Sequence, residues 1–406
     1  MTSRQTCRSD DDSQSYSNHL HSYSKYLSSQ PNQLPVNSIL PYPYQQDPNI
    51  STTISACCIT TLTGHTSYIS SLAIGGKFLY TGSSDNDIRA WIRNPLNSGQ
   101  EMGNPTDNIV AIGKGAVKSL VVLADKLFSA HQDHKIRVWR INNHENFQQK
   151  CIHLATLPTL GDRALKLLTP NSQVQVRRHK KCTWVHHVDT VSALALSQDQ
   201  SLLYSASWDR SFKIWQTSDL RCLESVGNAH DDAINALVLS DDGYVYTGSA
   251  DKKIKVWRKI PGEKKHSLVS TLEKHNSGIN ALALSNDGLV LYSGACDRSI
   301  VVWEKDDVGD MMVVGALSGH AKAILCLAVV SDLVFSGSAD KTIRIWRGIE
   351  KSYSCLAILE GHRGPVKCLT TAFDYYNPAE RSSGYLLYSG SLDCDIKMWQ
   401  IQIPVP

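Results

Sequence analysis

The stretch GHAKAILCLAVVSDLVFSGSADKTIRIW, residues 319–346, decides the fold, because its polar residues recur at fixed spacing along the chain. A histidine stands at position 320, and a serine at position 336 precedes Asp340 by four residues. Trp346 follows Asp340 after five intervening residues, among which apolar and polar side chains alternate. This alternation predicts a half-buried strand that ends at the tryptophan.

Seven copies of the pattern follow one another from about residue 55, and such self-similarity indicates a repeat architecture. The aspartate and tryptophan of each copy are Asp85/Trp91, Asp133/Trp139, Asp209/Trp215, Asp251/Trp257, Asp297/Trp303, Asp340/Trp346 and Asp393/Trp399. The hydroxyl residues four positions before each aspartate are Thr81, Ser129, Ser205, Thr247, Ser293, Ser336 and Ser389. A glycine or alanine follows every hydroxyl residue.

An upstream histidine completes six of the seven copies. These histidines are His65, His187, His230, His275, His320 and His362. The second copy has Gly113 at the corresponding position. Agreement of seven aligned copies at several positions is far more specific than any single match.

With its Gly-His pairs and Ser-x-Asp turns, the chain resembles the WD40 family over about residues 56–402. The resemblance implies an all-β fold, a seven-bladed β-propeller of four-stranded blades, over residues 55–406. The literal Trp-Asp ending of the family motif is absent, since residues such as Gln216 and Arg258 follow the tryptophans. The last blade lacks length for an outer strand after Trp399, so we expect residues 55–62 to supply that strand and close the ring.

The resemblance also implies that the His, hydroxyl, Asp and Trp of one blade, here called a tetrad, form a hydrogen-bonded chain. A histidine ring can donate to the carboxylate while its second nitrogen accepts the hydroxyl proton. The same three residue types make a Ser-His-Asp catalytic triad, but a set repeated in six blades indicates structure. We therefore expect no enzyme activity, no catalytic residue, no metal site and no cofactor. Because blade 2 has Gly113, we expect it to lack a complete tetrad and to be the loosest blade.

The segments outside the repeat have a different composition. Residues 1–54 are rich in Ser, Gln and Pro, and we expect a disordered tail because they lack apolar periodicity. About residues 145–186 contain an insertion between blades 2 and 3, with a basic run at 177–181 and a tryptophan at 184. This insertion is either an extra hairpin with a solvated basic face, or a nuclear-import signal or phosphate contact.

In WD40 proteins the loops that carry the tetrad turns usually form the partner-binding face. Trp208 lies just before a turn aspartate and is either an interface anchor or a residue that packs on the next blade. The other candidates on this face are Tyr68, Lys118, Asn235, Asn280, Lys367, Arg210, Lys252 and Arg298. The basic members suit an acidic or phosphorylated partner, although lysine is also a common turn residue.

Bulk properties narrow the class of protein. The formal net charge of +3 is too small to indicate nucleic-acid binding on its own, so nucleic acid is an unlikely partner. The polar start and the lack of a long apolar run predict neither a secretory signal nor a membrane span. Eleven scattered cysteines without a C-x-x-C pair indicate reduced thiols, and hence a protein of the cytoplasm and/or nucleus. We expect the propeller to be monomeric.

The leading function hypothesis is a non-catalytic protein-interaction scaffold with a regulatory role. The stretches at 129–139 and 177–187 are similar to plant JINGUBANG-like WD40 proteins, which implies developmental control, with transcription factors as one class of partner. The alternative is a substrate receptor of a cullin-type ubiquitin ligase. Those receptors carry Trp-Asp/Glu-x-Arg/Lys at a blade end, whereas here Trp303-Glu304 is followed by Asp306 where a base is needed.

Overall fold

A computed structural model describes residues 54–93, 108–142, 150–167, 173–177, 180–183, 185–260, 262–263, 265–307, 309–349, 352–373 and 382–404. The tail predicted at residues 1–54 lies almost entirely outside this described part. Within the compact unit Thr52–Pro406, the strands form seven four-stranded sheets and one two-stranded sheet. The seven-bladed β-propeller predicted from the repeats is therefore confirmed.

The first four blades each run from an inner to an outer strand in chain order. Blade 1 is β2 (Ile69–Gly75), β3 (Phe78–Ser83), β4 (Asp87–Ile92) and β5 (Ile109–Ile112). Blade 2 is β6 (Val117–Leu123), β7 (Lys126–His131), β8 (Ile136–Asn142) and β9 (Lys150–Leu157). Blade 3 is β12 (Val191–Leu196), β13 (Leu202–Ser207), β14 (Phe212–Gln216) and β15 (Cys222–Val226). Blade 4 is β16 (Ile234–Leu239), β17 (Tyr244–Ser249), β18 (Lys253–Lys259) and β19 (His266–Glu273).

The remaining three blades follow the same order until the last strand. Blade 5 is β20 (Ile279–Leu284), β21 (Val290–Ala295), β22 (Ile300–Lys305) and β23 (Met311–Leu317). Blade 6 is β24 (Ile324–Val330), β25 (Leu333–Ser338), β26 (Ile343–Ile349) and β27 (Ser352–Leu359). Blade 7 is β28 (Val366–Phe373), β29 (Ser382–Ser391), β30 (Ile396–Pro404) and β1 (Ser55–Leu62).

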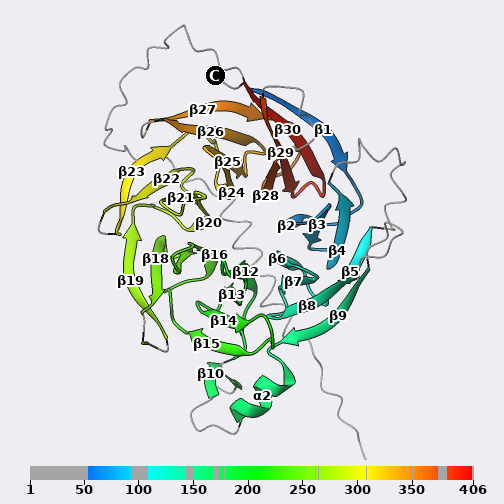
Figure 1. Cartoon of the computed structure of the whole chain (residues 1–406), viewed down its shortest axis with the longest axis vertical. Coiled ribbons are helices and arrows are strands. Elements are labelled where there is room, and N and C mark those ends of the chain that lie inside the picture. Colours follow the sequence, from blue (N-terminus) through cyan, green and yellow to red (C-terminus); the bar gives the residue numbers. More distant parts are fainter. Residues whose placement is uncertain are drawn as a thin grey trace, which may run out of the picture. The chain divides into compact units, whose positions relative to one another are not determined.

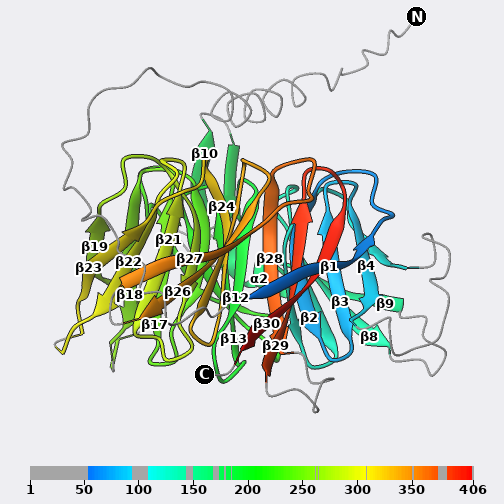
Figure 2. The same cartoon turned by 90° about the horizontal axis from the view of Figure 1, so that it is seen from above.

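The seven inner strands surround the centre of the ring, and each contacts the inner strand of the next blade, including β28 with β2 (Figure 1). β1 pairs antiparallel with β30 over Ser55 to Leu62, so a strand from the start of the propeller completes its last blade. Figure 2 shows β1 and β30 crossing the same side of the ring. Because β1 pairs with the outer side of β30, β30 is not left with an unpaired outer edge.

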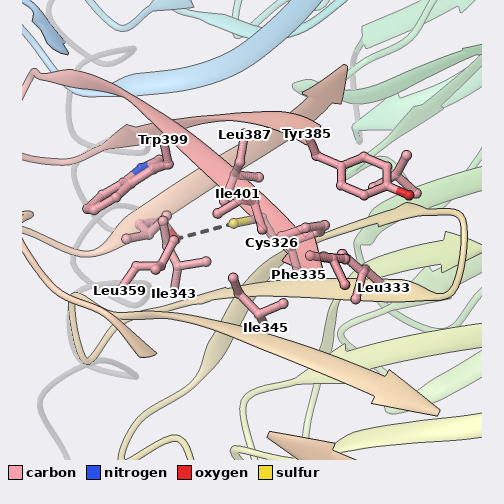
Figure 3. Packing of buried hydrophobic residues seen from close by; sticks show 13 residues of the cluster. Cys326, Leu333, Phe335, Ile343, Ile345, Leu359, Tyr385, Leu387, Trp399 and Ile401 are labelled. Carbon is pink, nitrogen blue, oxygen red and sulfur yellow. Dashed lines mark hydrogen bonds between the residues drawn. The ribbon is translucent and has the colours of Figure 1, made fainter. Parts of the chain in front are cut away.

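The hydrophobic core is divided among the seven junctions between blades. The described residues form seven buried clusters, each built from the facing sides of two neighbouring sheets. At the junction of blades 6 and 7, Phe335 and Ile345 face Leu387 and Trp399 (Figure 3). Strands buried on both faces in this way read as largely apolar runs, as in β24.

The small residue after each tetrad hydroxyl allows neighbouring blades to approach closely. A Cβ atom added at Gly337 would lie 2.7 Å from Val366 of the next blade, and one at Gly294 would lie 2.5 Å from Ile324. These separations are well inside van der Waals contact, so larger side chains would force the blades apart. The Gly-or-Ala rule of the sequence therefore reflects packing between blades.

Every inner strand contains one bulge, in which one extra residue opposes the second strand. The bulged residues are Ser70, Lys118, Ser192, Asn235, Asn280, Leu325 and Lys367. A bulge leaves one residue outside the regular ladder and re-aims its side chain. All seven therefore occupy equivalent places, next to the junction with the following blade.

The insertion between blades 2 and 3 leaves the ring after β9. It contains the helix α2 (Leu160–Leu167) and a hairpin of β10 (Gln173–Arg177) and β11 (Lys180–Thr183), and Figure 1 shows α2 and β10 outside β15. The Asp162 carboxylate is buried, accepts the Thr159 hydroxyl proton at 3.1 Å and also accepts the backbone N–H of Cys222 in β15. Helix α2 is thus attached to the outer strand of blade 3. The described helices include none long and apolar enough to cross a membrane.

Candidate functional site

Six blades contain a continuous hydrogen-bonded tetrad. In blade 6, Nδ1–H of His320 donates to Oδ2 of Asp340 at 2.8 Å, and Nε2 accepts the Ser336 hydroxyl proton at 2.8 Å. The indole N–H of Trp346 donates to the same Ser336 oxygen at 2.8 Å. The corresponding bonds unite the predicted residues of blades 1, 3, 4, 5 and 7.

The tetrad tryptophans belong to the hydrophobic core as well as to the hydrogen-bonded chain. The indole N–H groups of Trp91, Trp215 and Trp257 donate to their hydroxyls at 3.0, 2.9 and 2.9 Å. The three side chains are nevertheless buried, at 5%, 1% and 7% exposure. Each lies in the cluster at the junction with the preceding blade, as does Trp303. Most of the indole surface therefore stabilises the ring by packing between blades, and none of these residues is available to a partner.

The tetrad aspartate holds two loops together at one face of the ring. Asp340 accepts backbone N–H groups from Ala321, next to the tetrad histidine, and from Thr342, two residues further along its own turn. Burial alone would raise the pKa of Asp297 in blade 5, but hydrogen bonds from His275 and Ser299 lower it to about 2. The other five tetrad aspartates also have lowered pKa values, with a histidine among the main causes. They therefore stay ionised at neutral pH.

The tetrad hydroxyls cannot act as nucleophiles on a substrate. All seven hydroxyl residues are 0% exposed. Each of their oxygens already accepts the indole proton and donates to a histidine nitrogen, as in blade 6. A catalytic serine needs its oxygen at a cleft that a substrate can enter. The tetrads are consequently structural in this fold.

A basic residue stands four positions after the tetrad aspartate in six blades. These residues are Arg89, Arg137, Lys213, Lys255, Arg344 and Lys397, with Val301 in blade 5. The Arg344 guanidinium lies 5.9 Å from the ring centre of Trp346, and the Lys213 side chain is buried. Burial lowers the pKa of His187, and the charge of Lys213 lowers it further against the opposing effect of Asp209. Such a histidine stays neutral, as the tetrad requires.

As Gly113 predicts, blade 2 lacks a complete tetrad, because Nδ1 of its imidazole bonds a backbone carbonyl instead of the tetrad aspartate. That blade 2 is the loosest blade stays a prediction. His131, at the end of β7, accepts the Ser129 hydroxyl proton with Nε2 at 2.8 Å, and its Nδ1–H donates to the Gly115 carbonyl at 2.8 Å. The Trp139 indole N–H donates to Ser129 at 2.8 Å. The imidazole comes from the strand rather than from the loop, while the carboxylate of Asp133 pairs with Arg137.

Gly113 is the residue that makes this substitution possible. A Cβ atom at position 113 would lie 2.4 Å from Cε1 of His131, so the imidazole occupies the space next to the glycine backbone. Burial lowers the pKa of His131 to about 4, which keeps the ring neutral. The sequence contained a signal for this arrangement, because the one blade without a loop histidine has a histidine two residues after its hydroxyl.

The turn after each tetrad aspartate exposes a basic rim on blades 3 to 6. The residue that follows the aspartate has a positive φ in all seven blades, between 67° and 75°. In blades 3 to 6 this residue is Arg210, Lys252, Arg298 and Lys341, and all four side chains are exposed. A non-glycine residue in this backbone region is uncommon, so the turn geometry fixes where these four charges stand.

Two predicted contact residues instead connect neighbouring blades. The side-chain amide of Asn235 donates to the Ile279 carbonyl at 2.9 Å, and that of Asn280 donates to the Ile324 carbonyl at 2.8 Å. Both occupy the bulge of an inner strand, and Asn280 is 9% exposed. We therefore assign these amides to the joining of blades rather than to the partner-binding face.

The same kind of connection recurs around the ring. Ser70 donates to the Val117 carbonyl and Ser192 to the Ile234 carbonyl, again from bulge positions. At the last two junctions the donors are thiols, from Cys326 to Val366 and from Cys368 to Ile69; the dashed line in Figure 3 begins at the Cys326 sulfur. Between blades 2 and 3, Ser119 accepts the backbone N–H of Leu194 at 3.1 Å.

Tyr68 and Lys118 are in contact where blades 1 and 2 meet. The Lys118 ammonium donates to the Tyr68 hydroxyl at 3.1 Å and lies 5.3 Å from its ring centre. Burial would raise the pKa of Tyr68, but the charge of Lys118 with its hydrogen bond, and the charge of Lys367, lower it below its ordinary value. All three residues are half-buried.

Trp208, the predicted interface anchor, is half-buried in the turn before Asp209, where its backbone N–H donates to the Thr190 carbonyl at 3.0 Å. A half-buried tryptophan at this turn could either contact a partner or pack on the next blade, so the role of Trp208 stays a prediction. The insertion contains the predicted hairpin. Trp184 and the basic run at 177–181 lie outside the residues whose side chains the structure describes.

A buried polar cluster that the sequence motifs do not predict joins the outer parts of blades 3 and 4. The Glu224 carboxylate accepts Nδ1–H and the backbone N–H of His266, both at 2.8 Å. Nε2 of His266 lies 3.3 Å from the Tyr204 hydroxyl, and burial raises the pKa of Tyr204 to about 12. Tyr204 stands directly before the tetrad hydroxyl, a position that is Tyr or Phe in every blade. The repeat does not indicate that Glu224 and His266 join it.

Comparison with known families gives one clear match. The profile of the WD domain, G-beta repeat, matches residues 56–91, 179–216, 221–258, 266–304, 311–347 and 353–400. These six segments together cover more than half of the chain. Blade 2 lies in a stretch that the profile does not match, in line with its rearranged tetrad.

Several curated proteins are similar to the chain at low identity. The human Kinesin-like protein KIF21A is 25% identical over 71% of this chain and 19% of its own length. Protein ROOT INITIATION DEFECTIVE 3 of Arabidopsis thaliana is 31% identical over 45% of each chain. Cell division control protein 4 of Candida albicans is 26% identical over 28% of this chain and 17% of its own length. The chain thus spans about a fifth of the length of the first of these relatives.

Proposed function

The chain belongs to the WD40 repeat family, and from this premise we propose that it is a regulatory scaffold that binds partner proteins through the face of its tetrad turns. WD40 propellers typically bind other proteins. The observation that carries the proposal is that this face combines buried structural residues with exposed charged ones. Buried tetrads fix the turns, and the turns present exposed basic side chains at regular positions.

Rigidity of the turns supports this assignment. A surface whose side chains are held by a fixed backbone loses little conformational entropy when a partner binds. The exposed charges of Arg210, Lys252, Arg298 and Lys341 have the same sign on four consecutive blades. Charge complementarity with an acidic segment of a partner would speed association and favour partners of that kind.

We further propose a role in plant developmental regulation, in the nucleus or cytoplasm, with transcription factors as one class of partner. The support is the resemblance of residues 129–139 and 177–187 to JINGUBANG-like WD40 proteins. Similarity to an Arabidopsis protein, ROOT INITIATION DEFECTIVE 3, agrees with a plant context. Its identity of 31% covers less than half of either chain, so it supports no specific pathway.

The alternative of a ubiquitin-ligase substrate receptor receives less support. Its expected motif needs a basic residue at position 306, where the chain has an aspartate. The carboxylate of Asp306 accepts the backbone N–H groups of Gly309 and Asp310, both at 2.8 Å. The residue therefore stabilises a turn between strands, which explains why an acid occupies this position.

Affinity purification of the full chain with a tag tests the proposed function. The comparison is between the wild type, Trp208→Ala, and a variant with Arg210→Glu and Lys252→Glu together. We expect specific partners with the wild type and loss of some of them with either variant. A matched control is Lys265→Glu, an exposed charge outside the tetrad turns. If all variants retain the same partners as the wild type, this face is not the binding surface.

A further inference from the structure

Each outer strand of the propeller contains a bulge, and the bulged residue is apolar in all seven blades. These residues are Val110, Leu154, Leu223, Val269, Val314, Leu356 and Ile59. Those of blades 1, 5, 6 and 7 belong to, or pack against, the core cluster at the junction with the following blade. An apolar residue at the bulge therefore serves the packing of blades where the next blade covers it.

The bulge of blade 3 is not covered in this way. The Leu223 side chain is 51% exposed, the largest exposed fraction of the seven, and it belongs to neither core cluster that blade 3 helps to form. Leu154 and Val269 are exposed as well, so exposure alone does not single out Leu223. Its distinguishing feature is the insertion, which is bonded to the residue before it.

A second exposed leucine stands at the start of the insertion. The Asp162 carboxylate accepts the backbone N–H of Cys222 at 3.4 Å, which holds the first turn of α2 beside the residue that precedes Leu223. Leu160, the first residue of α2, is 81% exposed, more than any other large apolar side chain in the described part of the chain. Exposed apolar side chains that lie near one another, unlike single ones, mark interaction sites.

The insertion is also strongly basic. Residues 160–183 include six lysines and arginines but only one acidic residue, Asp162, which is buried and hydrogen-bonded. Lys180 and Lys181 belong to β11, and β11 contacts α2. Figure 1 shows α2 and β10 together outside β15. The two leucines therefore lie beside a segment whose charge suits an acidic partner.

We propose that the insertion and β15 form a second protein-binding surface, at the circumference of the ring, which receives a short acidic segment with leucine-like side chains from a partner. Leu160 and Leu223 pack against the apolar side chains of this segment, and the basic residues of the insertion attract its carboxylates. Nucleic acid fits less well, because its phosphate backbone offers no apolar group to cover the leucines. The surface is separate from the tetrad turns, so the inference goes beyond the proposed function.

A fluorescein-labelled decapeptide in which leucine and glutamate alternate is the probe for this surface. One matched peptide has serine in place of every leucine, and another has glutamine in place of every glutamate. Fluorescence anisotropy measures the binding of each peptide to the full chain. The wild type should prefer the probe at least about tenfold over either match, because one lacks the apolar contacts and the other lacks the charge.

Leucine substitutions locate the contact. Leu160→Ser and Leu223→Ser should each weaken binding of the probe about fivefold, because each removes an apolar contact with the peptide. Ile358→Ser is the matched control, since Ile358 is 48% exposed but lies on β27 of blade 6. Thermal unfolding of each variant checks that the propeller is intact, and Leu160→Ala or Leu223→Ala replaces a serine variant that unfolds below the wild-type temperature.

Charge substitutions test the contribution of the insertion. The double variant with Lys180→Gln and Lys181→Gln should weaken binding of the probe roughly fivefold and reduce its dependence on salt. The control combines Lys114→Gln with Lys322→Gln, at exposed lysines in the loops before β6 and β24. This control should bind the probe as the wild type does.

The proposal is wrong if the wild type binds the serine peptide as tightly as the probe, which would indicate attraction by charge alone. It is also wrong if Ile358→Ser weakens binding as much as Leu223→Ser. An oligothymidylate of the same length is the third test. Tighter binding of this strand than of the probe, unaffected by Leu160→Ser, would assign the insertion to nucleic acid instead. None of these results bears on the variants of the tetrad turns, so a failed second surface is distinguishable from a failed scaffold function.

Discussion

Nε2 of His131 lies 2.8 Å from the hydroxyl oxygen of Ser129, two residues earlier on the same strand. In the other six blades the corresponding imidazole comes from the loop before the inner strand, 16 to 27 residues away from its hydroxyl in sequence. Blade 2 thus keeps the bond between hydroxyl, imidazole and indole while it replaces the residue that supplies the imidazole. The fold therefore retains the hydrogen bonds of the hydroxyl to an imidazole and an indole, but not the sequence position of the histidine.

The first prediction concerns the space that this imidazole needs. Gly113→Ala should lower the free energy of unfolding by about 1–3 kcal/mol, because the new methyl group would overlap with His131. Gly227→Ala is the matched control, since nothing lies within 4 Å of a Cβ atom at that position. Urea unfolding of both variants measures the difference. Equal stability of the two would mean that His131 does not fill this space.

The second prediction is a rescue of the ordinary arrangement. His131→Ala alone should be destabilising, because it leaves the Ser129 hydroxyl without its acceptor in a buried site. Adding Gly113→His returns an imidazole to the loop, as in the other six blades, with Asp133 as its partner. The double variant should recover part of the lost unfolding free energy. An additive loss from the two substitutions would contradict the equivalence of the two positions.

The third prediction concerns a complete tetrad. Ser336→Ala should cost about 2–4 kcal/mol, because the indole N–H of Trp346 and Nε2 of His320 both lose their partner inside the protein. Ser218→Ala, at an exposed serine, is the control and should change stability by less than about 0.5 kcal/mol. Denaturant midpoints at constant pH give the comparison. A small effect of Ser336→Ala would argue that the tetrad contributes little to the fold.

The fourth prediction concerns ring closure. Deletion of residues 1–62 removes β1 and leaves the outer edge of β30 unpaired, so the protein should aggregate or lose its cooperative unfolding transition. Deletion of residues 1–50 retains β1 and should leave the unfolding temperature unchanged. Light scattering and calorimetry on both truncated chains provide the measurement. If the two behave alike, closure by β1 does not stabilise the ring.

The fifth prediction is a loss of stability on acidification, in two pH ranges. Burial lowers the pKa of His131 from 6.5 to about 4, so the unfolded chain takes up this proton first, and stability falls as the pH decreases from about 6.5 towards 4. The tetrad aspartates also have lowered pKa values, as in Asp297 at about 2 against an ordinary 3.8. Their contribution is complete above pH 4 and is lost as the pH falls towards 2. An unfolding temperature that is constant from pH 7 to pH 4 would be inconsistent with a buried neutral histidine in blade 2.

The fold was predictable because it depends on residues that repeat. Seven spaced Asp and Trp pairs predicted seven blades, and the structure has seven. The small residue after each hydroxyl was visible in the sequence, but its cause was not. Only the structure shows that a Cβ atom at Gly337 would meet the next blade, and that indoles such as Trp215 fill the junction with the preceding one.

The candidate site was less predictable, because its important features are departures from the repeat. The repeat spacing indicates that Gly113 breaks the pattern, but it does not indicate that His131 supplies the imidazole from a strand instead of a loop. Likewise, Asn280 and Lys367 occupy equivalent bulges and look alike as candidates in sequence. The bond from the Asn280 amide to the Ile324 carbonyl of the next blade is one that no local pattern encodes.

Hydrogen exchange of the tryptophan indole N–H groups, followed by NMR on a chain with ¹⁵N-labelled indoles, tests the central claim most directly. The claim is that seven buried hydrogen-bonded struts, including the rearranged one in blade 2, hold a closed ring. The account predicts that all seven indoles are protected from exchange in the folded protein, and that Trp139, whose blade lacks the bond between histidine and aspartate, is the least protected of them. Rapid exchange of Trp139, or of any other tetrad indole, in the folded protein would contradict it.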